Sequence, residues 1–444
     1  MFHISKDTEL TVSLLEKMIN RFNLNRKPYL EKMKKYYDGG QAILQKSYIN
    51  EDKAHSRVVT NYCKNITDSY CGYMAAPGCI SYSSEEDITD IMEILKYNDY
   101  QDEDSDFLLD ALIYGTAAEL MYTDESAKVR FRLINPTSCF GIYDDSLSND
   151  LLYFVRWYKA SEWDDSDLYN VDVYDNAYIK HYTMNGVNAG FLTLVSEEPH
   201  YFGQCPANIF NLQDEKSVFD CILSLQDASN EIMSAEIDDF SAFCDAYLVL
   251  TNVNVQSAQD AEKIKAGSML MLPEGATASF LTKNASDTQV ENILQRIHNS
   301  IYRIAACPDF SSESFVGGVS SGVAIKYRLT GMETRAAAIA ADMKKALQRR
   351  IEIICGIASL KLGEEVFRDI QISFKRNVPE DENSYIKVVK ELQGIVSDKA
   401  LLGQIPFIQD VNAEMEAIQE QKQNNVNIYQ GAFKTGEEEV SDEE

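Results

Sequence analysis

The fold is decided around the stretch Pro308-Asp-Phe-Ser-Ser-Glu-Ser-Phe-Val-Gly-Gly-Val-Ser-Ser-Gly322, which is polar and rich in glycine and serine. Because this composition cannot continue a helix, we expect a loop over 307–322. Apolar residues recur three and four positions apart on both sides of it, in Asp287–Ala306 and in Val323–Ile357. This spacing predicts two long amphipathic helices. Two helices joined by a flexible loop are typical of a mechanical element rather than of an enzyme site.

Composition limits the function classes. The chain has 444 residues, 45% of them hydrophobic and 25% charged, which is typical of a folded protein with several structural regions. It has 41 Lys and Arg against 70 Asp and Glu, a formal net charge of −29. Such a surface repels phosphate and argues against a protein that grips nucleic acid by electrostatic attraction. An acidic wall would instead suit a nucleic acid that must slide past without sticking.

Neither the cysteines nor the apolar runs indicate secretion or a membrane. The nine cysteines are scattered and form no CxxC pair, which predicts reduced core thiols. The N-terminus has no signal-peptide core, and no apolar run approaches the roughly 20 residues that span a bilayer. We therefore expect a cytoplasmic product without a membrane segment.

Helical patterns dominate the first 122 residues. A helix is expected after a cap at Asp7 or Thr8, and others are expected over 57–74, 85–98 and 106–122. A basic segment, Arg21–Lys35, is interpreted either as a solvated helix face or as a contact with DNA or an acidic neighbouring subunit.

From Lys128 to Val195 the apolar pattern changes to a period of two, with turn signals such as Asn185-Gly186. This alternation predicts a β-rich region folded against the N-terminal helices. The expected strands are Val129–Ile134, Cys139–Tyr143, Leu152–Tyr158, Tyr169–Tyr174, Ala177–Tyr182 and Gly190–Val195.

A long helix is expected over Asp214–Ser241, followed by a small α/β insert with strands near Tyr247–Thr251, Ser268–Leu272 and Thr277–Thr282. With the returning helix Asp287–Ala306, it would make a stalk with a tip. One side of the first helix is acidic and consists of Asp220, Asp227, Glu231, Glu236, Asp238 and Asp239.

The C-terminal part is expected to contain a strand at Asp369–Phe374 and helices near Ser384–Ile395 and Pro406–Lys422. The like charges of the last residues predict a disordered end over 431–444.

The sequence offers little catalytic chemistry. Gly317 and Gly322 have phosphate-loop spacing, but Val323 stands where that motif needs lysine. Asp102, Asp104 and Asp106 alternate like a calcium loop, without its glycine and glutamate. The five histidines show no metal-ligand spacing. We expect no catalytic residue, no metal and no cofactor.

Several short segments, in order along nearly the whole chain, resemble the portal proteins of tailed phages, in particular the family typified by the portal of a Bacillus siphophage. Each segment is weak alone, and their order carries the resemblance. They are Tyr36–Gly40, Val59–Asp68 with Gly72–Met74, Gly115–Tyr122, Asn135-Pro136 with Gly141–Asp144, Asp239-Phe240 with Asp245–Leu250, Ser321–Arg328, and Asp398–Leu402 with Pro406–Asp410.

The resemblance implies an α+β portal-type fold, with long stem and wing helices, a β-rich wing region, a small α/β clip and a helical crown. The corresponding ranges are 1–213 for the wing, 214–241 and 287–306 for the stem helices, 242–286 for the clip, 307–322 for the tunnel loop, 323–378 for the long wing helix and its strand, 379–430 for the crown and 431–444 for the acidic tail.

The resemblance also implies a function. Portals are rings, usually dodecameric, at one capsid vertex, through which double-stranded DNA is packaged and ejected. We expect a protein made in the bacterial cytoplasm and located in the virion. Its expected partners are further copies, DNA that passes without sequence specificity, the terminase large subunit, a head–tail adaptor, and capsid and scaffolding proteins.

Two sets of site residues follow from the resemblance. The tunnel-loop set beside DNA is Phe310, Ser311, Ser312, Glu313, Ser314, Phe315, Val316, Gly317 and Gly318. The clip set is Tyr247, Leu248, Val249, Met269, Leu270 and Met271. The loop has no lysine or arginine, so we expect a steric role through its two phenylalanines and its valine rather than phosphate binding.

Two alternatives belong to other classes. A nuclease or NTPase would need clustered carboxylates in a metal-binding context or a phosphate loop, and the sequence has neither pattern. Another non-enzymatic head–tail connector or adaptor ring protein shares the lack of catalysis. It does not require a stalk with a tip followed by a loop and a long helix.

Overall fold

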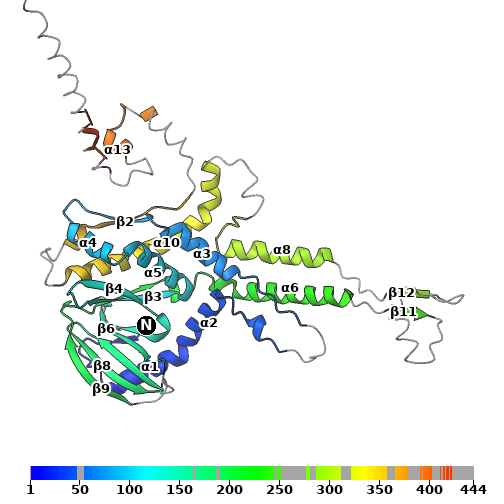
Figure 1. The fold of residues 1–444 in the computed structure, drawn as a ribbon, viewed down its shortest axis with the longest axis horizontal. Helices are drawn as coiled ribbons and strands as arrows, with labels where there is room; N and C mark the ends of the chain where they lie inside the picture. The colour runs from blue at the N-terminus through cyan, green and yellow to red at the C-terminus, as the bar shows by residue number, and fades with distance from the viewer. Residues whose placement is uncertain are drawn as a thin grey trace, which may run out of the picture. The chain divides into compact units, whose positions relative to one another are not determined.

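The structure is a computed structural model, and most of the chain is described (Figure 1). The described residues are 2–47, 55–163, 167–186, 191–244, 248–251, 277–280, 287–311, 322–357 and 366–378, with short pieces between 391 and 422. The chain divides into two compact units: one contains 1–319 and 324–377, and the other contains 320–323 and 378–444. Helices and strands mix in the first unit, which confirms the expected α+β class.

Five helices precede the strands. They are α1 (Val12–Asn25), α2 (Lys27–Tyr37), α3 (Tyr62–Ala75), α4 (Thr89–Tyr97) and α5 (Tyr100–Tyr114), with a short 3-10 turn η1 (Ala42–Gln45) between α2 and α3. The Thr11 side chain caps α1 and that of Asn61 caps α3. The helix expected from residue 57 therefore starts later, because residues 55–61 form no regular secondary structure.

The expected helix over 106–122 is wrong in its second half. Helix α5 ends at Gly115, whose φ of +79° belongs to the left-handed region that glycine adopts without strain. A Cβ there would lie 2.5 Å from the backbone carbonyl of Glu215. The following residues form strand β3 (Thr116–Thr123), which lies between β10 (Ala207–Asn211) and β4 (Val129–Ile134) in a three-stranded sheet. Pairing on both edges overrides the helical propensity of its alanines.

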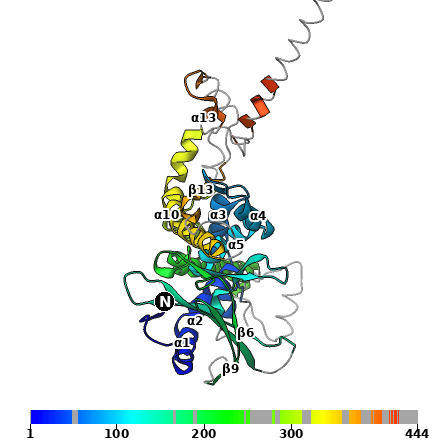
Figure 2. The same ribbon diagram turned by 90° about the vertical axis from the view of Figure 1, so that its left-hand side faces the viewer.

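The β-rich region is a six-stranded sheet in the order β1-β5-β6-β7-β8-β9. Two of its strands, β6 and β9, are labelled in Figure 2. Its strands are β1 (Phe2–Ile4), β5 (Cys139–Asp144), β6 (Leu151–Lys159), β7 (Leu168–Tyr174), β8 (Tyr178–Asn185) and β9 (Leu192–Pro199), so five of them confirm the sequence pattern. Strand β1 was not expected and pairs parallel with β5. Helix α1 packs on this sheet through Phe22, whose ring centroid lies 5.5 Å from that of Phe140 and 5.4 Å from that of Trp157.

Two long helices, α6 (Leu223–Cys244) and α8 (Asp287–Ile304), lie side by side as an antiparallel pair, here called the stem hairpin (Figure 1). Helix α6 begins nine residues later than expected. Asp214 and Glu215 have φ of +60° and +51°, which breaks the helix and leaves two 3-10 turns, η3 (Gln213–Glu215) and η4 (Asp220–Ile222). Of the insert, the antiparallel strands β11 (Leu248–Thr251) and β12 (Thr277–Phe280) are described. The expected strand 268–272 lies outside the described residues.

Helix α10 (Gly322–Cys355) matches the expected long helix. From residue 324 onward it belongs to the first unit, together with the short helix α11 (Val366–Asp369) and β13 (Gln371–Phe374), which pairs with β2 (Ile80–Ser83). We call the two larger sheets with α3, α5 and α10 the body. In the second unit, α13 (Asp398–Leu402) and scattered helical pieces are described, whereas most of the expected crown helices and the tail 431–444 lie outside the described residues.

Candidate channel site and its supports

The root of the stem hairpin is held by two side chains from the body. The hydroxyl of Tyr70 in α3 donates to the carbonyls of Ala305 and Ala306, at 2.9 and 3.1 Å. Arg335 in α10 donates to the carbonyl of Ala305 at 3.1 Å and to that of Val218 at 2.8 Å. These bonds satisfy carbonyl groups that the end of α8 leaves without helical partners. One arginine of α10 thus ties the chain entering the hairpin to the chain leaving it.

The first part of the loop begins at this root. Ala306 has a φ of +53°, and the Cys307 side chain is buried. Nε2 of His298 in α8 lies 3.3 Å from a carboxylate oxygen of Asp309. Of the expected loop residues, Phe310 is 41% exposed and the backbone N–H and hydroxyl of Ser311 both donate to Asp309. Ser312, Glu313, Ser314, Phe315, Val316, Gly317 and Gly318 lie outside the described residues.

The acidic residues assigned to the stem do not form one free face. Asp220 lies in η4, ahead of α6, 3.9 Å from the ammonium of Lys216. Others contact the N-terminal segment of the same chain: Asp227 accepts from the hydroxyl of Tyr36 at 2.9 Å, Glu231 pairs with Lys46, and Asp238 accepts from the N–H of Ser56 at 2.7 Å. Glu236 and Asp239 are exposed.

A ladder of hydrogen bonds joins α6 to the segment 56–62, which runs up to the first residue of α3. The backbone N–H groups of Ser56, Val58, Thr60 and Tyr62 donate to side-chain oxygens of Asp238, Ser234, Asn230 and Gln226, respectively, at 2.7, 3.0, 3.0 and 3.0 Å. Four helical residues rise about 6 Å, and two extended residues advance about 6.6 Å. The two repeats therefore stay in step over the four rungs.

The ladder was missed from the sequence, although its signal was available. Gln226, Asn230, Ser234 and Asp238 recur every fourth residue and all carry an acceptor. The amides of Gln226 and Asn230 are fully buried, and Asn230 also donates to the buried Gln41. Polar residues repeated at helical spacing can thus mark a buried face as clearly as apolar ones.

Of the expected clip residues, Leu248 and Val249 belong to β11. Tyr247, Met269, Leu270 and Met271 lie outside the described residues. The role of this set stays a prediction.

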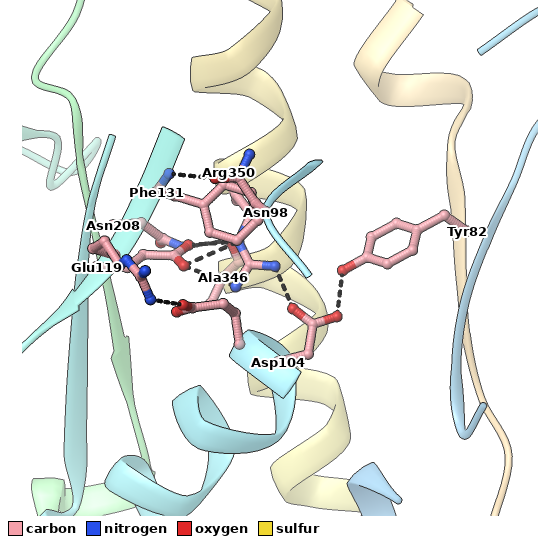
Figure 3. Close-up of polar contacts among 10 residues, drawn as sticks. Tyr82, Asn98, Asp104, Glu119, Phe131, Asn208, Ala346 and Arg350 are labelled. Atoms are coloured by element: carbon pink, nitrogen blue, oxygen red, sulfur yellow. Dashed lines mark hydrogen bonds and ion pairs between the residues drawn. The ribbon is translucent and has the colours of Figure 1, made fainter. Parts of the chain in front are cut away.

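A buried charged cluster fixes α10 in the body (Figure 3). The guanidinium of Arg350 is fully buried and pairs with Asp104 of α5 and with Glu119 of β3, in the latter case at 2.8 Å. The hydroxyl of Tyr82 in β2 donates to Asp104 at 2.8 Å, and Asn208 of β10 donates to Glu119 at 2.6 Å. Four elements, β2, α5, β3 and β10, therefore converge on one helix.

Burial dominates the titration of this cluster. It raises the pKa of the Asp104 carboxyl, although the guanidinium of Arg350 opposes that shift, and it raises the pKa of the Tyr82 phenol well above its usual range. Burial alone would lower the pKa of Arg350, but the carboxylates of Glu119 and Asp104 raise it well above its ordinary value. Arg350 therefore stays charged, and the alternation of aspartates that resembled a calcium loop contributes Asp104 to an ion pair.

The rest of the described chain offers no further reactive cluster. Among the residues that the structure places, no three His, Cys, Asp or Glu side chains gather to hold a metal. Within the same part of the chain, no helix is both long and apolar enough to cross a membrane. What the geometry provides is a braced helical hairpin leading into a loop.

Comparisons with known proteins agree with this geometry. A family model described as "Phage portal protein, SPP1 Gp6-like" matches residues 16–427. The portal protein of Bacillus phage SPP1 is 20% identical over 417 residues, covering 88% of this chain and 80% of that protein. The portal protein of Clostridium phage phiCD119 is 20% identical over 430 residues, covering 89% of this chain and 93% of that protein. The chain therefore belongs to the SPP1-type family of phage portal proteins.

Proposed function

We propose that this portal protein forms a ring of about twelve copies at one capsid vertex and that its channel passes double-stranded DNA during packaging and ejection. The family is a structural one, and a portal role places the protein in the virion, in a ring of copies associated with the capsid. The observation that carries the finer proposal is the stem hairpin, which is braced at its root and leads directly into the loop. This arrangement suits a channel wall with a constriction.

The dimensions of the helices support a DNA channel. About twelve helices of roughly 10 Å diameter, set side by side, give a circumference near ~120 Å and a bore of about 28 Å. That bore passes a DNA duplex with space to spare. A net charge of −29 disfavours adhesion of phosphate, which suits a duplex that slides.

The contacts of the α6 carboxylates narrow the proposal for the channel wall. Asp227, Glu231 and Asp238 contact the chain's own N-terminal segment. We therefore propose the exposed Glu236, rather than the whole acidic set, as an acidic group of α6 that acts on passing DNA.

The partners follow from the same proposal. We propose that the 242–286 clip meets the terminase large subunit during packaging and the head–tail adaptor afterwards, and that capsid and scaffolding proteins surround the wing. The protein would be made in the bacterial cytoplasm. The 310–318 loop would act sterically, since it contains no lysine or arginine.

Mass and shape test the ring. Native mass spectrometry with negative-stain microscopy should find about twelve chains of 50.2 kDa around a central channel. Shells, sheets or a closed dimer with a deep cleft would contradict the portal ring. A flat ring that binds a completed head, but not the terminase, would favour the alternative of a head–tail connector or adaptor.

A loop variant tests the steric role. Phe315→Gly combined with Val316→Gly should leave ring assembly intact but impair packaging or DNA retention, because the bulky side chains would be gone. Phage yield and packaged DNA length measure the effect. Normal yield from the double variant would remove the loop from the mechanism.

A further inference from the structure

A groove lies between α1 and the two larger sheets. It has a volume of about 640 Å³ and is lined by residues of α1, β1, β5, β3 and β10. Aromatic rings form its floor: the ring centroid of Phe140 lies 4.9 Å from that of Phe2 and 5.5 Å from that of Phe22. A hollow of this size and polarity can receive a bulky side chain from outside, and we call it the α1 groove.

The rim of the α1 groove is positively charged. Lys17 and Arg21 line it one helical turn apart on α1, and both are exposed. Neither forms an ion pair within the part of the chain that the structure describes. Arg26 lines the same groove, 3.8 Å from a carboxylate oxygen of Glu215. Among the described residues, three cations and one carboxylate therefore line a groove on a chain whose net charge is −29.

This geometry bears on the basic segment Arg21–Lys35, for which a solvated helix face and a contact with DNA or an acidic neighbouring subunit were both expected from the sequence. A solvated face needs no apolar groove beside its charges. A DNA duplex presents phosphates rather than an apolar side chain that could enter the groove. A cationic rim around an aromatic floor instead fits an acidic peptide segment that carries a bulky apolar residue.

The chain itself contains a segment of this chemistry. Residues 431–444 place one aromatic residue, Phe433, ahead of six carboxylates: Glu437, Glu438, Glu439, Asp442, Glu443 and Glu444. We infer that the α1 groove binds residues 431–444 of a neighbouring copy, with Phe433 on the aromatic floor and the carboxylates along the cationic rim. The inference rests on the proposed ring only in that the ring brings the copies together.

The expected contact is weak and sensitive to salt. The like charges of residues 431–444 oppose a fold of their own, so binding must also order the segment, which lowers the affinity. Exposed ion pairs each contribute little and are screened by salt. Within a ring, however, a tethered segment reaches an effective concentration on the order of mM, at which a weak contact is occupied.

Peptide binding to the full-length protein tests the charged rim. A fluorescein-labelled peptide of residues 431–444 should raise its fluorescence anisotropy on binding, and the affinity should fall as salt is added. Lys17→Glu combined with Arg21→Glu should raise the dissociation constant at least tenfold. Lys32→Glu combined with Lys35→Glu is the matched control, because it makes the same charge change at exposed positions of α2 outside the groove. It should raise the dissociation constant less than threefold, and equal losses in both double variants would overturn the inference.

Changes in the peptide test the apolar anchor and the fold of the variants. Phe433→Ala in the peptide should raise the dissociation constant at least fivefold. A peptide with Glu437→Lys, Glu438→Lys and Glu439→Lys should bind the Lys17→Glu, Arg21→Glu protein more tightly than it binds the wild type, which requires a folded groove. Undiminished binding of the Phe433→Ala peptide, or displacement of the original peptide by a short DNA duplex, would overturn the proposed occupant.

Photo-cross-linking identifies the copy that supplies the segment. Tagged full-length chains that carry p-benzoylphenylalanine in place of Phe433 are co-expressed with untagged chains that lack it. Mass spectrometry should find adducts on α1 or β5 of untagged chains. Cross-links found only within the tagged chain, or only outside the groove, would overturn the inference.

The outcomes separate this inference from the proposed function. Rings that form while the peptide shows no binding would overturn the inference and leave the proposed function standing. A protein that binds the peptide in the groove but forms no ring under any condition would overturn the proposed function and keep the contact between copies.

Discussion

The body and the stem hairpin both bury polar groups on long helices, but they satisfy them by different means. In the body, Arg350 on α10 is neutralised by Asp104 and Glu119, all within one chain and almost fully buried. In the stem, neutral amides such as Asn230 accept backbone N–H groups on one side only, and isoleucines on the other side stay half-exposed. The charged cluster of the body is thus neutralised within a single chain, whereas the stem leaves apolar side chains half-exposed. This difference is expected of a rigid platform that carries a part to be shared among copies.

The largest effect is expected from removing the charge at the centre of the body. Arg350→Met would leave Asp104 and Glu119 buried without their counter-ion, and breaking a buried pair in this way costs about 3–5 kcal/mol. Denaturation of the single chain in guanidinium chloride, followed by circular dichroism, measures the free energy of unfolding.

The neighbouring arginine provides the control for that experiment. Arg349 is partly exposed, pairs with Glu352 at 2.9 Å and donates to Gln204 at 2.6 Å, so Arg349→Met should cost less, about 1–2 kcal/mol. Equal losses for the two variants would mean that the buried cluster does not hold α10 in the body.

Sequence patterns predicted the helices and strands of the body and the stem that depend on local periodicity. The three-four spacing around Ile297 and Ile339 predicts α8 and α10 nearly to the residue, and alternation predicts five strands of the six-stranded sheet. These elements have one apolar side and a uniform pattern, so local sequence is sufficient.

The predictions that failed concern features that depend on partners distant in the sequence. Residues 116–123 have helical composition, yet they form a strand because β10, some 90 residues away, pairs with them and Gly115 ends the helix. Helix α6 starts later than expected because Asp214 and Glu215 adopt left-handed backbone angles, which local sequence did not predict. The Arg350 cluster joins residues more than 230 positions apart, so no local spacing could reveal it.

An intermediate loss in the free energy of unfolding is expected from breaking one hydrogen bond of the ladder. Asn230→Ala removes the acceptor of the half-buried Thr60 N–H and the donor to the fully buried Gln41. Leaving such groups unsatisfied costs about 1–3 kcal/mol. Exposed Asn292 of α8 gives the control, because Asn292→Ala removes no contact of this kind.

Hydrogen exchange sharpens that test. The Thr60 amide should exchange faster in Asn230→Ala, whereas amides in the six-stranded sheet should keep their protection. An unchanged exchange rate of the Thr60 amide would show that the ladder does not fasten the stem to segment 56–62. The stem and the body would then no longer differ in how they satisfy buried polar groups.

The smallest effect concerns Asp110 of α5, whose carboxyl, unlike that of Asp104, is not paired with Arg350. Burial raises its pKa to about 7, the carboxylate of Asp106 adds to the shift, and Lys34 opposes it. The folded chain then holds this proton more tightly than the unfolded chain, whose aspartates titrate near about 3.9. The favourable contribution of Asp110 is therefore complete below about pH 4 and is lost as the pH rises to 7.

Replacing that carboxyl by an amide should remove the pH dependence. Because Asp110 is only half-buried, solvent screens part of the cost, so Asp110→Asn should raise the free energy of unfolding at pH 8 by about 1–2 kcal/mol over the wild type, less than the full pKa shift implies, with a much smaller difference at pH 4. Asp90→Asn, at an exposed position of α4, should show no such divergence between the two pH values. If Asp110→Asn is no more stable than the wild type at pH 8, Asp110 keeps its charge at no cost. In that case half-burial on α5 costs a carboxylate nothing, and the cost of charge in the body is confined to the fully buried Arg350 cluster.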